Sequence, residues 1–351
     1  MKIAVLCDYR LMPERVGGMD RFFWLFDAEC KALGYEIIWF FPNAAHYEGY
    51  NELTIVTANG KSVEQTFLAF EHSFDVVFTH FLELCTPFYK VVKQQKLATK
   101  MIAVDHNPRP FNGYPWKKRL QKRIKGLLYA SSVDLFIGVS QYTLNEIFKD
   151  FGHHLKNRTQ LIYNGIAHQK FKKRTSRNFQ KPTFVVACHL RYSKGIQDLI
   201  EAVALLPKEM LSHLCIDIYG EGEYQSTLNT LISNYHLQDH FVFKGSAANL
   251  YEIYCQYDYL LQPTHMECFS LAILESLSAN VPVITTPVGG NVEVVENGVN
   301  GYILPINDSK RWSLLLEKLY AGDEKIIVDT SSLIENEFSI QKMVENYMKL
   351  L

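Results

Sequence analysis

The sequence predicts an α/β protein made of two similar domains that face each other, each built on a parallel sheet. Short apolar runs typical of strands alternate with amphipathic helical segments along most of the chain. A polar segment rich in lysine and arginine, residues 169–181, interrupts this alternation near the middle and is interpreted as a linker. The chain has 351 residues, a length that favours two domains over one.

The composition is that of a globular protein with a substantial core, because 48% of the residues are hydrophobic and 21% are charged. The formal net charge of −1 gives no indication of a nucleic-acid partner. The seven cysteines show no Cys-x-x-Cys spacing, which argues against a zinc site or a disulfide framework, and we expect reduced thiols. No signal peptide and no apolar run of about 18 residues is seen, so we expect a cytoplasmic protein.

The first half opens with a strand–turn–helix–strand unit. Residues 2–8 have the pattern of a buried strand, residues 20–33 that of a helix, and residues 35–41 that of the next strand. Gly17 and Gly18 lie in the first turn, where they could bind a phosphate or substrate or could serve only to allow a positive φ. The turn lacks the three-glycine dinucleotide fingerprint, so a nicotinamide site is not expected.

Two later strands of the first half end in histidine. The runs at residues 75–80 and 100–106 end in His80 and His106. Ligands of open α/β sheets gather at the carboxyl ends of strands, so each histidine is a candidate site residue. The alternative for each is a hydrogen-bonded structural histidine. Two further strand-like runs complete this half, residues 134–140 and 160–164.

A strongly basic segment, residues 115–129, has the pattern of an amphipathic helix. It indicates either a helix resting on an anionic membrane surface or a solvated helix whose apolar stripe packs on its own sheet. The segment has few interleaved aromatic residues, so a nucleic-acid partner is not expected. The apolar positions are Trp116, Leu120, Ile124, Leu127 and Leu128, and the basic residues assigned to a membrane or acceptor are Lys117, Lys118, Arg119, Lys122 and Arg123.

Strand–helix alternation resumes after the polar segment, with a strand at residues 184–188 and a helix at 196–205. Lys194 and Gly195 lie in the turn between them. A lysine in such a turn suits a diphosphate, and the alternative is a solvated turn residue. The remaining strand-like runs of this region are residues 214–219, 241–243 and 259–262.

The stretch from Thr264 to Pro305 is the most informative of the chain. A loop leads into an apolar helix at residues 271–279, which is followed by a buried strand at 281–285 and a loop with paired glycines, residues 289–290. A helix N-terminus offers N–H groups and the positive end of a dipole, and both suit a phosphate. The residues placed to supply those N–H groups are Phe269, Ser270 and Leu271.

Two acidic residues flank this helix start. Glu267 lies in the loop and Glu275 lies eight positions later, inside a nearly apolar helix. A carboxylate in such surroundings needs a specific partner, and carboxylates accept hydrogen bonds from hydroxyl groups. An anion cradle with two hydroxyl acceptors is what a sugar nucleotide requires. The alternative is that both residues are solvated surface charges.

Taken together, these segments resemble the retaining glycosyltransferases of the large group-one family (family four). The resemblance covers most of the chain and is densest from Cys188 to Pro305. Glu267 and Glu275 match the E-x7-E pair of that family, and the stretch that follows resembles its donor-site signature. Weaker similarities lie at the Gly17-Gly18 turn and at residues 163–165, 218–222, 241–245 and 338–351.

The resemblance implies the GT-B fold, in which two Rossmann-like domains face each other across a cleft. It implies an acceptor domain at residues 1–168, a nucleotide-sugar donor domain at 169–335, and a C-terminal helix at 336–351 that crosses back to the first domain.

The resemblance also implies roles for individual residues. Glu275 would hold the ribose hydroxyls, Glu267 the transferred sugar, and the N–H groups of residues 269–271 the diphosphate. Lys194 would neutralise the leaving phosphate and His106 would approach the donor sugar. The catalytic set is therefore His106, Lys194 and Glu267.

One position departs from the family pattern. An arginine usually lies five or six residues before the lysine, but Cys188 and His189 occupy that place and Arg191 lies two residues further on. Either His189 or Arg191 could take over. The donor-binding set is Gly17, Gly18, His189, Arg191, Lys194, Gly220, Lys244, Phe269, Ser270, Leu271 and Glu275.

The implied activity is transfer of a sugar from a UDP- or GDP-sugar to an acceptor hydroxyl, with the anomeric configuration retained and without a metal or other cofactor. The acceptor would be a glycan or a lipid-linked sugar in bacterial cell-surface polysaccharide, lipopolysaccharide or glycolipid synthesis. The enzyme would be cytoplasmic, with a peripheral position on the inner face of the membrane as a further expectation. Two alternatives stay open, a GT-B-fold nucleotide-sugar epimerase and a non-catalytic sugar-nucleotide-binding protein.

Overall fold

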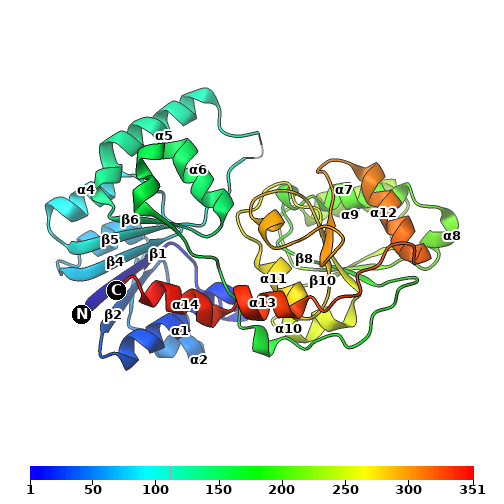
Figure 1. Ribbon diagram of the computed structural model, residues 1–351, viewed down its shortest axis with the longest axis horizontal. Helices are drawn as coiled ribbons and strands as arrows, with labels where there is room; N and C mark the ends of the chain where they lie inside the picture. Colours follow the sequence, from blue (N-terminus) through cyan, green and yellow to red (C-terminus); the bar gives the residue numbers. More distant parts are fainter. Residues whose placement is uncertain (111) are drawn as a thin grey trace. The chain divides into compact units, whose positions relative to one another are not determined.

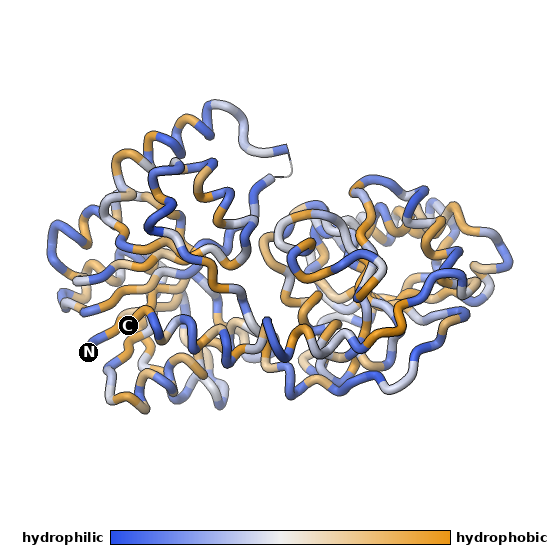
Figure 2. The backbone as a smooth tube through the Cα atoms, viewed as in Figure 1, coloured by the Kyte–Doolittle hydropathy of each residue, from blue (hydrophilic) through white to orange (hydrophobic). Residues whose placement is uncertain are grey.

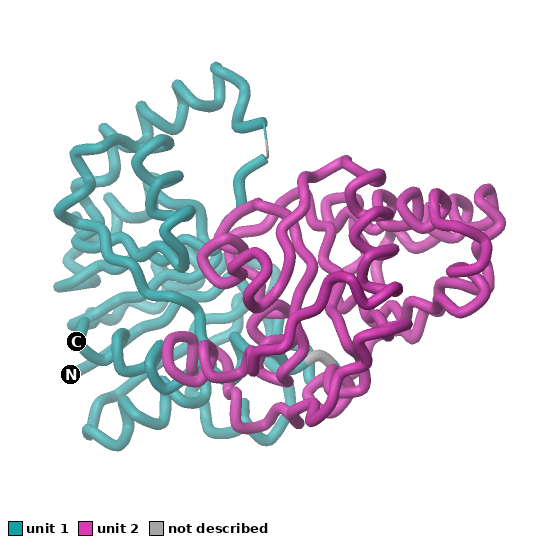
Figure 3. Tube along the Cα trace, turned by 45° about the vertical axis from the view of Figure 1, so that its right-hand side comes forward, with its two compact units in different colours: residues 1–165, 340–351 teal, residues 166–339 magenta. Residues whose placement is uncertain are grey.

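The computed structural model describes residues 1–110 and 112–351. The chain forms two compact units (Figure 3): unit 1 comprises residues 1–165 and 340–351, and unit 2 comprises residues 166–339. Each unit has a central parallel sheet with helices packed against it (Figure 1). The predicted α/β class with two parallel-sheet domains is therefore confirmed.

Unit 1 contains a seven-stranded sheet in the order β3-β2-β1-β4-β5-β6-β7. The chain winds outward from β1 in one direction and then from β4 in the other, so the loops that follow β1 and β4 diverge at their carboxyl ends. Ligand sites of open α/β sheets lie at such a point. The strands are β1 Lys2–Cys7, β2 Glu36–Phe41, β3 Ile55–Thr57, β4 Phe74–His80, β5 Ala98–Asp105, β6 Leu135–Gly138 and β7 Thr159–Leu161.

Helices cover both faces of this sheet, with α1 and α14 on one face and α5 and α6 on the other (Figure 1). Central strands read as continuous apolar runs because both of their faces are buried; in β1, for example, only Lys2 is exposed. The helices are α1 Gly18–Ala32, α2 Glu48–Asn51, α3 Val63–Leu68, α4 Pro87–Gln94, α5 Trp116–Tyr129, α6 Gln141–Phe151 and α14 Ile340–Met348.

The last helix, α14, is part of the aromatic core of unit 1 although it comes from the end of the chain. Tyr347 is fully buried, and its ring centroid lies 4.8 Å from that of Phe22 and 5.9 Å from that of Phe78. The ammonium of Lys100 donates to the Leu350 carbonyl at 2.5 Å. Side-chain packing and a strand contact therefore hold the C-terminal segment on this unit.

Unit 2 contains a six-stranded parallel sheet in the order β10-β9-β8-β11-β12-β13. Its strands are β8 Phe184–Ala187, β9 Ile216–Tyr219, β10 Phe241–Gly245, β11 Tyr259–Gln262, β12 Val283–Thr285 and β13 Gly301–Ile303. Its helices are α7 Ile196–Ala204, α8 Lys208–Leu211, α9 Gln225–Asn234, α10 Leu250–Ile253, α11 Leu271–Ser278, α12 Ser309–Ala321 and α13 Ser331–Glu337. Apolar and polar stretches follow one another along the chain in Figure 2.

The basic segment that the sequence suggested as a linker packs on unit 2. Arg174 forms an ion pair at 2.6 Å with Asp258, whose side chain is fully buried. Arg177 donates to the Ile326 carbonyl at 2.7 Å and to the Asn280 carbonyl. Its positive charges therefore satisfy buried acceptors of unit 2, which a charge count along the sequence does not reveal.

All seven cysteines are free thiols, as expected, and four of them, Cys7, Cys30, Cys85 and Cys268, are buried. Among the described residues, no helix has both the length and the apolar content needed to cross a bilayer.

Tyr347 provides a test of how α14 is held. Its hydroxyl is buried and has no hydrogen-bond partner among the described residues. We expect Tyr347→Phe to preserve or slightly raise the free energy of unfolding, since an unsatisfied buried hydroxyl costs about 1 kcal/mol or more. Tyr347→Ala should lower it by about 3–5 kcal/mol because it leaves a cavity among aromatic rings. Urea unfolding followed by circular dichroism measures both, and comparable losses in the two variants would contradict this account.

Candidate functional site

The predicted donor residues of unit 2 lie in loops at one edge of its sheet. Strands β9, β8, β11 and β12 are consecutive neighbours and run parallel, so their carboxyl ends share that edge. The loops that follow them contain the residues at 188–195, 220–222, 263–270 and 286–290. Segments separated by about a hundred residues in the sequence are therefore close in space.

The loop after β8 and the loop after β11 are in direct backbone contact. Gly195 has φ 70°, and a Cβ added there would lie 1.8 Å from the Pro263 carbonyl oxygen. The Ser193 carbonyl accepts hydrogen bonds from the His265 N–H at 2.8 Å and from the Thr264 hydroxyl at 3.1 Å. Only glycine fits this position, because it needs both the left-handed backbone and the missing side chain.

This contact brings Lys194 to Glu267. The Lys194 Nζ lies 2.7 Å from the Glu267 Oε2, and the two side chains are 21% and 16% exposed. Burial alone would lower the pKa of Lys194, but the Glu267 carboxylate outweighs it and raises that pKa above its ordinary value. The structure therefore joins two of the three predicted catalytic residues in one charged pair.

The paired glycines after β12 support the same loop from the other side. Gly289 has φ 59°, and a Cβ there would lie 2.2 Å from the Glu267 carbonyl oxygen. The Gly290 N–H donates to the Cys268 carbonyl at 2.8 Å, and the Cys268 N–H donates to the Glu267 Oε1 at 3.1 Å. Both carboxylate oxygens of Glu267 thus have donors, so the side chain is held in one orientation.

The second acidic residue, Glu275, has a partner that the sequence did not indicate. The hydroxyl of Tyr254, a fully buried side chain, donates to the Glu275 Oε2 at 3.1 Å. Burial, reinforced by the Glu275 carboxylate, raises the pKa of Tyr254 well above its ordinary value. The phenol therefore stays protonated and orients the carboxylate. Tyr254 lies in no motif, so no sequence signal could have singled it out.

The start of α11 has no side-chain cap. Ser270 is the N-cap residue, but its hydroxyl accepts a 2.6 Å hydrogen bond from the Gln262 amide instead of capping the helix. Phe269 and Ser270 are buried, and Leu271, the first helical residue, is partly exposed. The first N–H groups of an α-helix lack intrahelical partners, which is the property on which the predicted phosphate cradle depends.

The loops after β8 and β9 are also in close contact. Gly220 has φ 134°, and a Cβ there would lie 1.9 Å from the Cys188 carbonyl oxygen. The Leu190 N–H donates to the Glu221 carbonyl at 2.9 Å. His189, between them, is partly buried.

Two predicted donor-binding cations are at the surface of unit 2. Arg191 is exposed. Lys244 is also exposed, and its Nζ lies 3.5 Å from the Asp217 carboxylate on the neighbouring strand. Lys194 is therefore the most enclosed of the predicted donor-binding cations.

In unit 1, the glycine turn is organised by a buried carboxylate. Gly17 is the N-cap of α1 and Gly18 is its first residue. Asp20 is 1% exposed and accepts hydrogen bonds from the Gly17 N–H at 2.7 Å, the Tyr50 hydroxyl at 2.5 Å and the Tyr9 hydroxyl at 3.0 Å. An acidic residue three positions after a helix cap is a recognisable sequence signal, and it could have identified Asp20.

The two strand-end histidines contact each other. His80 Nδ1 lies 2.9 Å from His106 Nε2, and the Phe81 ring stacks on His106 with centroids 4.2 Å apart. Burial lowers the pKa of His106 to about 3 and, together with His106, lowers that of His80 well below its ordinary value. Both rings are therefore neutral at physiological pH, with one donating and one accepting. This geometry matches the structural alternative, and a role for His106 at the sugar stays a prediction.

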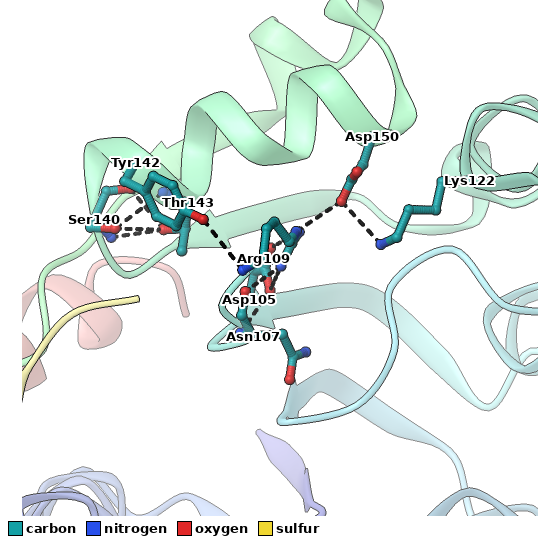
Figure 4. Close-up of polar contacts among 8 residues, drawn as sticks. All are labelled: Asp105, Asn107, Arg109, Lys122, Ser140, Tyr142, Thr143 and Asp150. Carbon is teal, nitrogen blue, oxygen red and sulfur yellow. Dashed lines mark hydrogen bonds and ion pairs between the residues drawn. The ribbon is translucent and has the colours of Figure 1, made fainter. Parts of the chain in front are cut away.

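Beside these histidines, four buried charged groups form a network (Figure 4). Asp150 accepts from Arg109 Nε at 2.9 Å and from Lys122 Nζ at 3.0 Å, and Arg109 pairs with Asp105 at 2.6 Å. Burial opposes the charge of Arg109, but Asp105 and Asp150 raise its pKa above the ordinary value. The network joins α5, α6 and the loop after β5, and the sequence indicated neither Arg109 nor Asp150.

The five basic residues assigned to a membrane or acceptor divide into two groups. Lys122 is buried in this network, contrary to the expected surface position, because Asp150 requires a counter-charge. Arg123 donates to the Lys149 carbonyl at 3.0 Å near the end of α6. Lys117, Lys118 and Arg119 are exposed.

Comparison with known proteins gives two family matches that together extend over most of the chain. The model described as "Glycosyltransferase Family 4" matches residues 16–170, and the model described as "Glycosyl transferases group 1" matches residues 168–327.

Individual relatives align with only part of their length. N-acetyl-alpha-D-glucosaminyl L-malate synthase of Bacillus anthracis is 27% identical over 231 residues, 58% of this chain and 60% of the relative. The GtfA subunit of the UDP-N-acetylglucosamine–peptide N-acetylglucosaminyltransferase of Streptococcus pneumoniae is 32% identical over 178 residues, 50% of this chain and 35% of the relative.

A likeness of fold extends over the whole chain. The crystal structure of Anabaena HepE in complex with UDP and glucose superimposes with a TM-score of 0.77 at 16% identity, covering 100% of this chain and 99% of that one. From the two family matches, the chain belongs to the glycosyltransferases of group 1 and family 4, and the shared architecture shows the GT-B fold.

Proposed function

We propose that this protein transfers a sugar from a nucleotide diphosphate sugar to a hydroxyl group of a glycan or lipid-linked acceptor. The observation that carries the proposal is the enclosed pair of Lys194 and Glu267 at the carboxyl edge of the unit 2 sheet. Glycosyl transfer from such a donor needs a cation for the leaving diphosphate and a carboxylate for the sugar hydroxyls. The pair supplies both within hydrogen-bond distance of each other.

The donor-bound state would redistribute these contacts. The Lys194 ammonium would also contact the diphosphate, whose negative charge grows as the bond between the sugar and the diphosphate breaks. Because Glu267 and the glycine contacts already hold the ammonium in place, little reorganisation is required, and this is the condition under which electrostatic stabilisation is most effective. The N–H groups at the start of α11 would bind the same phosphates.

Glu275 would accept hydrogen bonds from the ribose hydroxyls, with Tyr254 fixing its orientation. The buried Tyr254 hydroxyl, 3.1 Å from the Glu275 Oε2, holds this carboxylate in one orientation. Tyr254 would then be a positioning residue, because it acts through Glu275.

For the donor we propose a UDP-sugar, with UDP-N-acetylglucosamine as the first to test and GDP-sugars as the comparison. One relative is named for transfer of N-acetylglucosamine from UDP, and another for an N-acetylglucosaminyl product. The structural neighbour HepE was crystallised with UDP and glucose. A thermal-shift series over UDP- and GDP-sugars would identify the base, since a ligand at a hundredfold excess over Kd stabilises by about 2.7 kcal/mol.

We propose a place in bacterial polysaccharide, lipopolysaccharide or glycolipid synthesis, at the inner face of the membrane. The bacterial origin of these relatives, together with a structural neighbour named as a lipopolysaccharide outer core galactosyltransferase, supports the proposed pathway. The basic helix α5 supports the proposed membrane location.

We also propose that the anomeric configuration is retained and that no divalent cation is required, because Lys194 and the α11 N-terminus would neutralise the diphosphate. We expect excess EDTA to leave the rate of nucleoside diphosphate release within about twofold of the untreated rate. Proton NMR of the glycoside would give the anomer. A rate abolished by EDTA and restored by Mg²⁺ would refute metal independence.

The role of Lys194 can be tested by substitution. We expect Lys194→Ala to lower kcat by about 10²–10³-fold, the usual loss when one preorganised electrostatic group is removed from a developing negative charge. Lys310→Ala, an exposed lysine on α12, is the matched control and should keep the parental rate. Release of UDP from the donor measures both, with thermal denaturation to confirm folding. A Lys194→Ala rate equal to that of the control would refute the proposed role of Lys194 in the donor site.

The positioning role of Tyr254 gives a different signature. We expect Tyr254→Phe to raise KM for the donor by about 10–100-fold with little change in kcat, because a hydrogen bond to a charged group contributes roughly 1.5–3 kcal/mol. Tyr235→Phe, at an exposed tyrosine, is the control. A fall in kcat at constant KM would place Tyr254 in the chemical step instead.

A further inference from the structure

Helix α5 exposes an unusual number of large apolar side chains. Trp116 is 68% exposed, Leu127 is 70%, Leu128 is 56%, Leu120 is 52% and Ile124 is 46%. Single exposed apolar residues are common on proteins, but a contiguous group marks an interaction surface.

These five side chains form one stripe, which we call the apolar face of α5: Trp116, Leu120, Ile124, Leu127 and Leu128. At about 100° per residue, they fall within an arc roughly 120° wide. The buried residues of the helix, Lys122 and Gly126, lie on the other side. The helix is therefore inverted relative to an ordinary surface helix, and the alternative interpretation, in which its apolar stripe packs on the sheet of unit 1, is wrong.

Two contacts explain why the helix does not turn its apolar face inward. The Lys122 ammonium lies between the carboxylate of Asp150 and the rings of Tyr114 and Phe151, at 4.8 and 5.1 Å from their centroids. Gly126 touches the end of α6, since a Cβ there would lie 2.5 Å from the Phe151 carbonyl oxygen. Rotation of the helix would leave Asp150 and Arg109 with unbalanced buried charge, which is strongly destabilising.

The charges beside the apolar face indicate the chemistry of its partner. The helix carries six basic residues and no acidic residue. Lys117, Lys118 and Arg119 are exposed at its start, while Lys125 pairs with Glu83 at 2.7 Å. In a chain with a formal net charge of −1, this is a local concentration of positive charge. The partner should combine an apolar interior with a negatively charged surface.

A bilayer that contains anionic lipid has both properties. Interfacial helices lie in the membrane plane with their apolar side chains at the boundary between headgroups and acyl chains and with lysine and arginine at the phosphates. A second copy of this chain fits less well, because two such helices would bring their basic residues against one another.

We propose that α5 docks this protein on an anionic bilayer through its apolar face, with Lys117, Lys118 and Arg119 contacting lipid phosphates. The inference rests on the proposed membrane location and identifies the apolar face of α5 as the surface that contacts the lipid. The buried network of Asp105, Arg109, Lys122 and Asp150 keeps this surface turned outward in the absence of lipid.

Co-sedimentation with vesicles tests the proposal. We expect wild-type protein to bind vesicles of phosphatidylglycerol and phosphatidylcholine, and the double variant Leu120→Ser/Leu127→Ser to lose at least tenfold in partition coefficient. The control is Leu205→Ser/Leu314→Ser, which alters two leucines of unit 2 that are each 53% exposed and should bind like wild type. Wild-type protein that stays in solution, or equal binding by both double variants, would overturn the proposal.

Two further measurements test the role of the basic residues and the insertion of Trp116 into the bilayer. Lys117→Gln/Lys118→Gln/Arg119→Gln should weaken binding to phosphatidylglycerol vesicles and leave the weak binding to pure phosphatidylcholine unchanged. Brominated lipid should quench wild-type fluorescence more than that of Trp116→Phe, because the other three tryptophans are less exposed. Identical quenching would show that Trp116 does not enter the bilayer and would refute the docking orientation.

Two measurements separate this inference from other outcomes. Stabilisation by UDP should be the same in wild type and Leu120→Ser/Leu127→Ser. Wild-type protein that UDP does not stabilise would refute the proposed donor site, while the docking surface would still be decided by vesicle binding. Sedimentation velocity should show the same oligomeric state for both proteins. Dissociation of a dimer by the double variant, with no vesicle binding by wild type, would identify the apolar face as a contact between copies and overturn the membrane proposal.

Discussion

The close approach of backbone segments is the constraint on which the candidate donor site depends. At Gly195 and Gly289, a side chain would overlap the carbonyl oxygens of Pro263 and Glu267. Because both glycines also have positive φ, they allow the loops after β8 and β12 to lie directly against the loop after β11. The meeting of Lys194 and Glu267 follows from this contact. The charged pair is therefore a consequence of backbone geometry rather than of two flexible side chains finding each other.

In unit 1, buried charge has a comparable organising effect. Buried charges must balance one another, and the four buried side chains Asp105, Arg109, Lys122 and Asp150 do so through short contacts. The balance sets the rotation of α5 and ties it to the loop after β5. An amphipathic helix would normally bury its apolar stripe, but here turning the stripe inward would leave the buried Asp150 carboxylate without Lys122, which is strongly destabilising.

Several polar groups owe their protonation state mainly to burial. Burial lowers the pKa of His80 and of His106, and Tyr254 keeps its proton because it is buried beside the Glu275 carboxylate. Each of these groups is surrounded by residues that are distant in the sequence. Their hydrogen-bonding roles are therefore properties of packing, and they support the neighbouring loops before any substrate is considered.

The sequence by itself determined the α/β class, the division into two parallel-sheet units and most of the strands, because buried parallel strands appear as continuous apolar runs whatever surrounds them. It also indicated Glu267, Glu275 and Lys194, since glycine turns and helix starts are local signals. The sequence did not reveal Tyr254, Arg109 or Asp150, the packing of the basic segment on unit 2, or the direction in which α5 faces. Those features depend on which distant segment lies alongside, and helical periodicity defines a stripe without saying whether protein or solvent covers it. Only the tertiary structure decided that, through the buried counter-charge that Lys122 supplies to Asp150.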